Sequence, residues 1–245
     1  MSTIMTTFDA RDPKFQLNDQ FKPDKEALWR HPKEEDGWVH AHNALRYEIQ
    51  SLIEATEATN KRSGQKLQQW EIECITKAWK AHEEHIHSHH ANEDNIMGPY
   101  LSTRFHYPDK YTADHDELVQ KLDKLQKIVE NLKPGVGGTA ALLQELHEYE
   151  ALARLLQEEI ECLPLCRAYF TPKEISAKVQ EMLAHAPKVE LGSFIYAMGV
   201  EKFRKQFMRQ EGIPFFVWYI DFVWKVKHFR RVFVAPIETL KAGGI

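Results

Sequence analysis

His89 and Glu93, a histidine and a glutamate four residues apart, are the pair in this chain whose types and spacing best suit metal chemistry. Residues four apart lie on one face of an α-helix, about one turn from each other. An imidazole nitrogen and a carboxylate oxygen placed in this way can both bind one metal ion. The spacing alone is common, so the prediction depends on ligands from other segments.

His42 is the first such partner, because it lies in the apolar stripe of an earlier helical segment. If His42, His89 and Glu93 converge, they form a two-histidine, one-carboxylate set with open positions, which suits non-haem Fe(II). His115 occupies a stripe position in a third segment. It could be a fourth ligand, or it could hold part of a second metal together with Glu159.

Glu158 and Glu159 are competing carboxylate candidates in a fourth segment. At 100° per residue, Glu158 falls in a polar row opposite Leu156, which indicates a solvated face. Glu159 lies nearer the apolar edge, so the helical wheel favours Glu159 as the ligand.

Helical periodicity is the main structural signal in the chain. Apolar residues recur at steps of three and four in four long segments, and turn residues separate them. Four long helices with short connections predict an all-α fold, an up-down-up-down four-helix bundle whose core can hold a metal. The polar leader predicts an N-terminal arm, and the remaining helices predict a C-terminal extension. The expected parts are an arm over 1–36, a bundle over 37–185 and an extension over 186–245. In the bundle we expect long helices from 38 to the break at 63–64, at 72–100, at 111–132, and from 139 past Pro164 to just before Thr171, with a short helix at 173–184. In the extension we expect helices at 193–210 and from 215 to just before Pro236.

Composition excludes several classes of protein. The net charge is −4, so no basic bias indicates a nucleic-acid partner. Three cysteines form no disulfide framework and indicate a reducing, intracellular and cytoplasmic location, with Cys162 and Cys166 predicted as buried thiols. The longest apolar stretch, 213–223, is too short to span a bilayer.

No nucleophile stands at a meaningful spacing from a histidine, which favours a binding protein over an enzyme without deciding between them.

The order of these motifs resembles the hemerythrin-like family over about residues 38–180. The motifs that carry the resemblance are His42-Asn-Ala-Leu-Arg46, His89-x-x-x-Glu93 with Pro99, Asp114-His115-Asp-Glu-Leu118, Glu158-Glu159 before Pro164, and Thr171-Pro-Lys-Glu174. In that family a four-helix bundle with HHE motifs holds two irons through five histidines and two bridging carboxylates. The resemblance therefore implies iron, with dioxygen or a reactive oxygen species as a partner to be bound or sensed.

Carried over residue by residue, the resemblance predicts an incomplete site. His42 matches the first-helix ligand, His89 and Glu93 match the second-helix pair, and His115 matches one third-helix histidine. The family register favours Glu158 rather than Glu159. Tyr111 and Arg154 stand where the family has its other two histidines. We therefore expect at most one well-held metal, a mononuclear or incomplete di-iron site, with zinc as the alternative metal.

Two further alternatives stay open. The bundle could be a metal-free scaffold that serves as an interaction module, with Tyr111 bonded to His115 or Glu159. The aromatic and basic segment 215–234 could either cap the bundle or lie on an anionic membrane surface. The other histidines are expected beside the ligands or in solvent (His82, His85, His87 and His90), or exposed on the opposite face of the first helix (His40).

Overall fold

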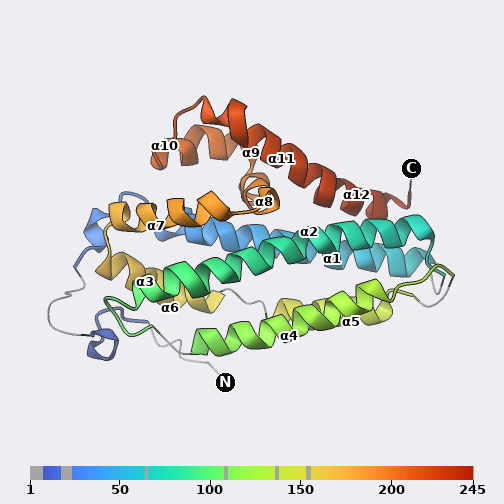
Figure 1. Cartoon of the computed structure of the whole chain (residues 1–245), viewed down its shortest axis with the longest axis horizontal. Coiled ribbons are helices and arrows are strands. Elements are labelled where there is room, and N and C mark those ends of the chain that lie inside the picture. Colours follow the sequence, from blue (N-terminus) through green and yellow to red (C-terminus); the bar gives the residue numbers. More distant parts are fainter. Residues whose placement is uncertain are drawn as a thin grey trace, which may run out of the picture.

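Long helices dominate the computed structural model. The structure describes residues 8–17, 24–63, 66–107, 110–135, 138–152 and 156–244. Within these ranges it does not describe the side chains of residues 63, 110–116, 152, 156 and 157. Helices α1, α2, α4 and α5 run along the longest axis of the molecule (Figure 1). No β-strand forms among the described residues, where Gln16 and Phe105 make an isolated antiparallel bridge. The predicted all-α fold is confirmed.

The four long helices form a ring. Helix α1 (Gly37–Ser63) contacts α2 (Gln69–Asn92) and α5 (Ala140–Leu152), and α4 (Lys110–Glu130) contacts the same two. Each helix thus has two neighbours, which confirms the predicted bundle. Its stripe residues fill the core, where Leu45, Ile49 and Leu122 are almost completely buried.

The second helix continues beyond α2 through a widened turn. A π-helical segment, η4 (Glu93–Met97), follows α2 directly and leads into α3 (Gly98–Leu101). The predicted helical run over 72–100 is therefore correct, but the sequence did not indicate the π turn. The turn begins at Glu93, and such turns are frequent at functional sites.

The structure describes two helices within the span predicted as the fourth helix. Helix α5 ends at Leu152, and α6 spans Leu156–Tyr169 with Pro164 inside it. The next helix, α7 (Pro172–His185), begins at a capping box in which the Thr171 and Glu174 side chains each bond the other's backbone.

The arm lies against α6. Trp29 donates its indole N–H to the Phe170 carbonyl at 3.1 Å, and Arg167 donates to the His31 carbonyl at 2.6 Å. Segment 24–36 therefore covers one side of α6 next to the bundle.

The first helix of the extension begins earlier than predicted, and its last helical run ends later. Helix α8 starts at Lys188 rather than residue 193 and ends at Met198; the next residue, Gly199, has a φ of 91°, which favours glycine. The last helical run passes through Pro236 instead of ending before it. A π turn precedes Pro236, so its missing N–H falls in the first turn of a new helix. The extension consists of α8 (Lys188–Met198), α9 (Val200–Lys202), η5 (Phe203–Phe207), α10 (Met208–Gln210), η6 (Trp218–Phe222), α11 (Val223–Phe229), η7 (Arg230–Val234) and α12 (Ala235–Ala242).

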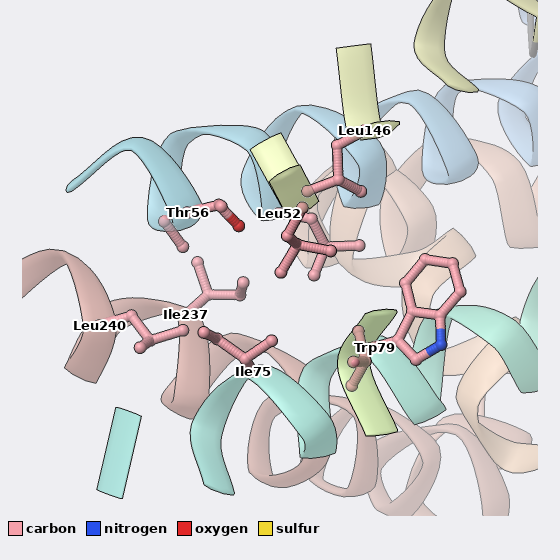
Figure 2. A pocket seen from close by; sticks show the side chains of 10 residues that line it. Leu52, Thr56, Ile75, Trp79, Leu146, Ile237 and Leu240 are labelled. Carbon is pink, nitrogen blue, oxygen red and sulfur yellow. The ribbon is translucent and has the colours of Figure 1, made fainter. Parts of the chain in front are cut away.

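The extension completes the hydrophobic core of the bundle. Helix α8 packs on α1, and α12 packs on α1 and α2. Phe229 and Phe233 are fully buried in the same cluster as the bundle stripes. Ile237 and Leu240 face Ile75 across an apolar pocket (Figure 2). Residues 229–240 thus cap the bundle, while the domain boundaries at 36 and 185 stay predictions.

Across the described part of the chain, no helix is both long enough and apolar enough to cross a bilayer.

Candidate metal centre

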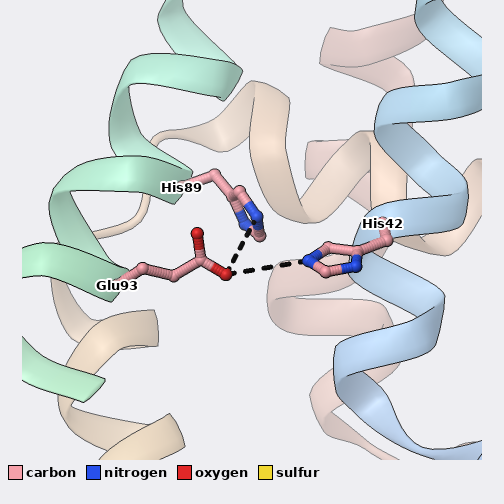
Figure 3. A group of neighbouring side chains, drawn as sticks. All are labelled: His42, His89 and Glu93. Carbon is pink, nitrogen blue, oxygen red and sulfur yellow. Dashed lines mark ion pairs between the residues drawn. The ribbon is translucent and has the colours of Figure 1, made fainter. Parts of the chain in front are cut away.

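Three predicted ligands from two helices meet in the bundle core. One ligand atom from each of His42, His89 and Glu93 lies within 4.8 Å of the other two, and all three residues are buried. The Glu93 Oε1 lies 3.3 Å from His89 Nε2 and 3.7 Å from His42 Nε2. Figure 3 shows the two imidazoles and the carboxylate converging between α1 and α2.

These distances fit a shared metal ion. Ligand atoms about 2.1 Å from one ion stand roughly 3–4 Å apart in tetrahedral or octahedral geometry. The two measured separations fall in this range. The donor set of two imidazoles and one carboxylate is therefore suited in both chemistry and spacing to a transition metal.

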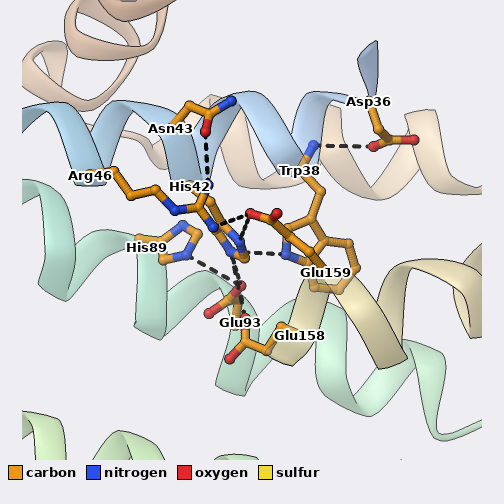
Figure 4. A network of polar contacts seen from close by, with 9 residues as sticks. All are labelled: Asp36, Trp38, His42, Asn43, Arg46, His89, Glu93, Glu158 and Glu159. Atoms are coloured by element: carbon orange, nitrogen blue, oxygen red, sulfur yellow. Dashed lines mark hydrogen bonds and ion pairs between the residues drawn. The ribbon is translucent and has the colours of Figure 1, made fainter. Parts of the chain in front are cut away.

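Glu158 and Glu159 both reach His42, from opposite sides of its ring (Figure 4). Glu158 Oε2 lies 3.5 Å from Nε2, the nitrogen that faces Glu93, whereas Glu159 Oε1 accepts a hydrogen bond from Nδ1 at 2.9 Å. The expectation that Glu158 lies on a solvated face was wrong: it is 7% exposed, because it faces His42 of α1 and lies near the Tyr107 ring. In this arrangement Glu158 is on the ligand side, and Glu159 orients the ring.

Carboxylates control the charge of His42. Burial lowers its pKa, but the carboxylates of Glu159, Glu93 and Glu158 outweigh burial and raise the pKa to about 9. Burial raises the pKa of Glu159, yet His42 and Arg46 together bring it below its usual value. A carboxylate that accepts a hydrogen bond from one imidazole nitrogen makes the other nitrogen more basic and orients it toward the metal position, as is typical of metal-bound histidines.

Three neighbours of the ligands were not foreseen from the sequence. Trp38 donates its indole N–H to His42 Nε2 at 3.1 Å, and Arg46 donates to Glu159 at 2.6 Å. The Trp38 contact requires a lone pair on Nε2 and opposes the proton that the carboxylates favour, but three negative charges outweigh one indole dipole. Tyr107 lies near the same carboxylates, and burial first, then Cys162, Glu93 and Glu158, raises its pKa far above the usual value. Trp38 and Arg46 stand four residues either side of His42, which is the signal that could have found them.

A second buried polar layer lies about two helical turns further along α1 and α2. Glu48 accepts hydrogen bonds from Nδ1 of His82 at 2.6 Å and of His85 at 2.8 Å. Nε2 of His82 lies 2.8 Å from the hydroxyl of Tyr149. Burial raises the pKa of Glu48, but the two imidazoles outweigh it and lower the pKa to about 2.

The remaining histidines differ in burial. His85 and His90 are buried, and His87 is exposed. His40 was expected in solvent, but it is 6% exposed, because Phe194 and Phe207 of the extension pack against its ring.

The positions expected to hold the other half of a di-iron site cannot be placed. The side chains of His115 and Tyr111, and residue Arg154, lie outside the described residues. The two predicted buried thiols, Cys162 and Cys166, are buried, and neither forms a disulfide with a described cysteine.

Comparison with known proteins agrees with the geometry. Residues 29–162, more than half of the chain, match the family model described as the hemerythrin HHE cation binding domain. This chain belongs to the hemerythrin HHE family. All of the predicted ligands fall within the matched HHE region, and α7 to α12 lie beyond it. No curated protein and no solved structure matches the chain.

Proposed function

We propose that this HHE protein binds one transition metal ion, iron, through His42, His89 and Glu93. The convergence of these three buried side chains within 4.8 Å carries the proposal. Glu158 is a fourth candidate ligand, because its Oε2 lies 3.5 Å from the same nitrogen of His42.

A two-histidine, one-carboxylate set leaves coordination positions open, and iron held in this way supplies a redox centre that can meet dioxygen or a reactive oxygen species. Neighbouring residues hold the ligands in position. Glu159 orients His42, Arg46 holds Glu159, and the surrounding helices exclude bulk water. We infer a role in binding or sensing oxygen species rather than catalysis, in a reducing cytoplasm that keeps the three cysteines out of disulfide bonds.

A single ion is proposed because only one ligand set is assembled among the described side chains. A contribution from His115, with or without a second metal, stays a prediction. Zinc suits the same donors and is the competing metal.

Metal content tests the proposal. Protein purified with and without oxygen is assayed for iron and zinc, next to His89→Ala and His87→Ala. His87 is the matched control, because it is a histidine on the same helix but is exposed. We expect about one iron per chain in the wild type and in His87→Ala, and loss of iron in His89→Ala. Metal-free protein under both conditions, with no change in stability when Fe(II) is added, would refute metal binding.

One observation favours a second candidate, a metal-free scaffold. His42 is already paired with Glu159 and Glu93, so the cluster can persist without an ion. His89→Leu separates the two functions. A metal site loses its ion and the stability that the ion supplies, whereas a scaffold tolerates the apolar residue.

A further inference from the structure

A group of exposed aromatic and aliphatic side chains lies at the turn of the extension, which stands on the side of the molecule away from α4 and α5 (Figure 1). We call it the aromatic tip; its members are Phe215 (79% exposed), Phe216 (52%), Tyr219 (58%), Ile220 (68%) and Trp224 (61%). Among the other described residues, the exposed large apolar side chains are scattered and none is aromatic. A concentration of this kind marks an interaction site.

The tip rests on a rigid base. The opposite face of the same helical run buries Trp218, Phe222 and Val226 against α8 and η5. Helices α8 and α11 touch at Gly192, where an added Cβ would come within 2.4 Å of the Lys225 carbonyl oxygen. The exposed side chains are therefore held outward by a packed helix pair.

Cations accompany the aromatic rings. Lys227 Nζ lies 4.5 Å from the ring centre of Trp224. Arg204 lies over Tyr219, 5.7 Å from its ring centre, and donates a hydrogen bond to its hydroxyl at 3.2 Å. Trp and Tyr beside Lys and Arg are the side chains that sit at the level of lipid headgroups.

Charge is divided unevenly along the chain. Residues 186–245 contain ten Lys and Arg against five Asp and Glu, a net charge of +5, so the first 185 residues carry −9 of the total −4. A cationic aromatic surface complements an anionic bilayer, whereas two copies meeting tip to tip would bring like charges together.

We propose that the aromatic tip docks this protein on an anionic phospholipid surface, with Phe215 and Ile220 entering the headgroup region and Lys227, Arg204 and Arg230 facing lipid phosphates. The apolar side chains from Phe229 to Leu240 take no part, because they are buried on the bundle. The docking surface is thus narrower than segment 215–234 and does not depend on metal binding.

Vesicle cosedimentation of the full chain tests this proposal. The probes are vesicles of phosphatidylcholine with phosphatidylserine, and vesicles of phosphatidylcholine alone. The tip variant is Phe215→Ser with Ile220→Ser, and the matched control is Leu28→Ser with Leu183→Ser, two exposed apolar residues elsewhere (54% and 41%). A charge variant, Lys227→Gln with Arg230→Gln, removes two exposed cations.

We expect binding to the phosphatidylserine vesicles and little to phosphatidylcholine alone. The tip variant should bind at least about tenfold more weakly, the charge variant roughly tenfold more weakly with reduced salt sensitivity, and the control as the wild type does. No binding to anionic vesicles, or equal binding by wild type and tip variant, overturns the proposal. A wild-type dimer that the tip variant converts to a monomer, without vesicle binding, identifies the tip as a contact between copies and also overturns it.

Discussion

Glu159→Gln is the substitution that most directly tests whether the charge on Glu159 increases the affinity of His42 for a metal. Gln keeps the size of the side chain, and its amide oxygen can still accept from His42 Nδ1 and Arg46, which both donate to Glu159 Oε1. The change therefore removes a negative charge while preserving the contact. Loss of such a partner behind a metal-bound histidine weakens metal affinity by about 10- to 100-fold, roughly 1.4–2.7 kcal/mol.

Proton competition makes the size of this loss depend on pH. The pKa of His42 is raised to about 9, so in the wild type a metal must displace a proton at neutral pH. Apparent affinity should then rise about tenfold per pH unit below that pKa. In Glu159→Gln the pKa of His42 falls, so metal binding releases fewer protons and the apparent metal affinity depends less on pH. The penalty of the substitution should grow as pH rises.

Zn(II) titration against a chromophoric chelator, from about pH 6.5 to about pH 8.5, measures how the apparent metal affinity changes with pH in the wild type and in Glu159→Gln. Imidazole NMR of the metal-free protein measures the pKa of His42 directly. Glu211→Gln, at an exposed carboxylate of the extension, is the matched control and should behave as the wild type does. Parallel pH profiles for wild type and Glu159→Gln, or tighter binding by the variant throughout, would refute the role given to Glu159.

Three other results are expected, each from a different part of the core. Metal-free protein should lose stability as pH rises from about 6.5 to about 9, because the raised pKa of His42 stabilises the fold only while the ring is protonated; thermal unfolding should show this trend, and metal-loaded protein should show a flatter one. Glu48→Gln should cost about 3–5 kcal/mol in urea unfolding, because the two buried imidazoles lose their shared carboxylate charge, and a cost under about 1 kcal/mol would contradict the layer's structural role. Gly192→Ala should destabilise the chain by at least about 1–3 kcal/mol through its clash with the Lys225 carbonyl, and an unchanged urea midpoint would show that α8 and α11 do not approach so closely.

The sequence predicted those features that depend on periodicity within one helix. The stripes of α1, α2 and α4 identified the bundle, and the four-residue spacing of His89 and Glu93 identified the ligand pair, since a regular helix converts spacing into direction. His42 was found because a polar residue at a core-facing position requires an explanation.

Features that depend on neighbours from distant segments could not be predicted. The helical wheel placed Glu158 in solvent because it could not include His42 of α1, which faces Glu158 across the core. His40 was expected to be exposed because the aromatic residues that bury it lie more than 150 positions away in the extension. The π turn at Glu93 and the helix through Pro236 depend on tertiary packing, which outweighs local preference.

The joining of the extension to the bundle core has a consequence for the order of folding. Phe233 and Leu240 pack with Leu45 and Leu52, so contacts that close one core span nearly two hundred residues. Contacts of such long sequence separation form slowly. During synthesis the α1–α2 face must remain uncovered until residues 229–240 have left the ribosome, and the unfinished bundle is then prone to aggregate. We therefore expect a nascent chain halted near residue 185 to be a substrate for chaperones, although its four long helices are already present.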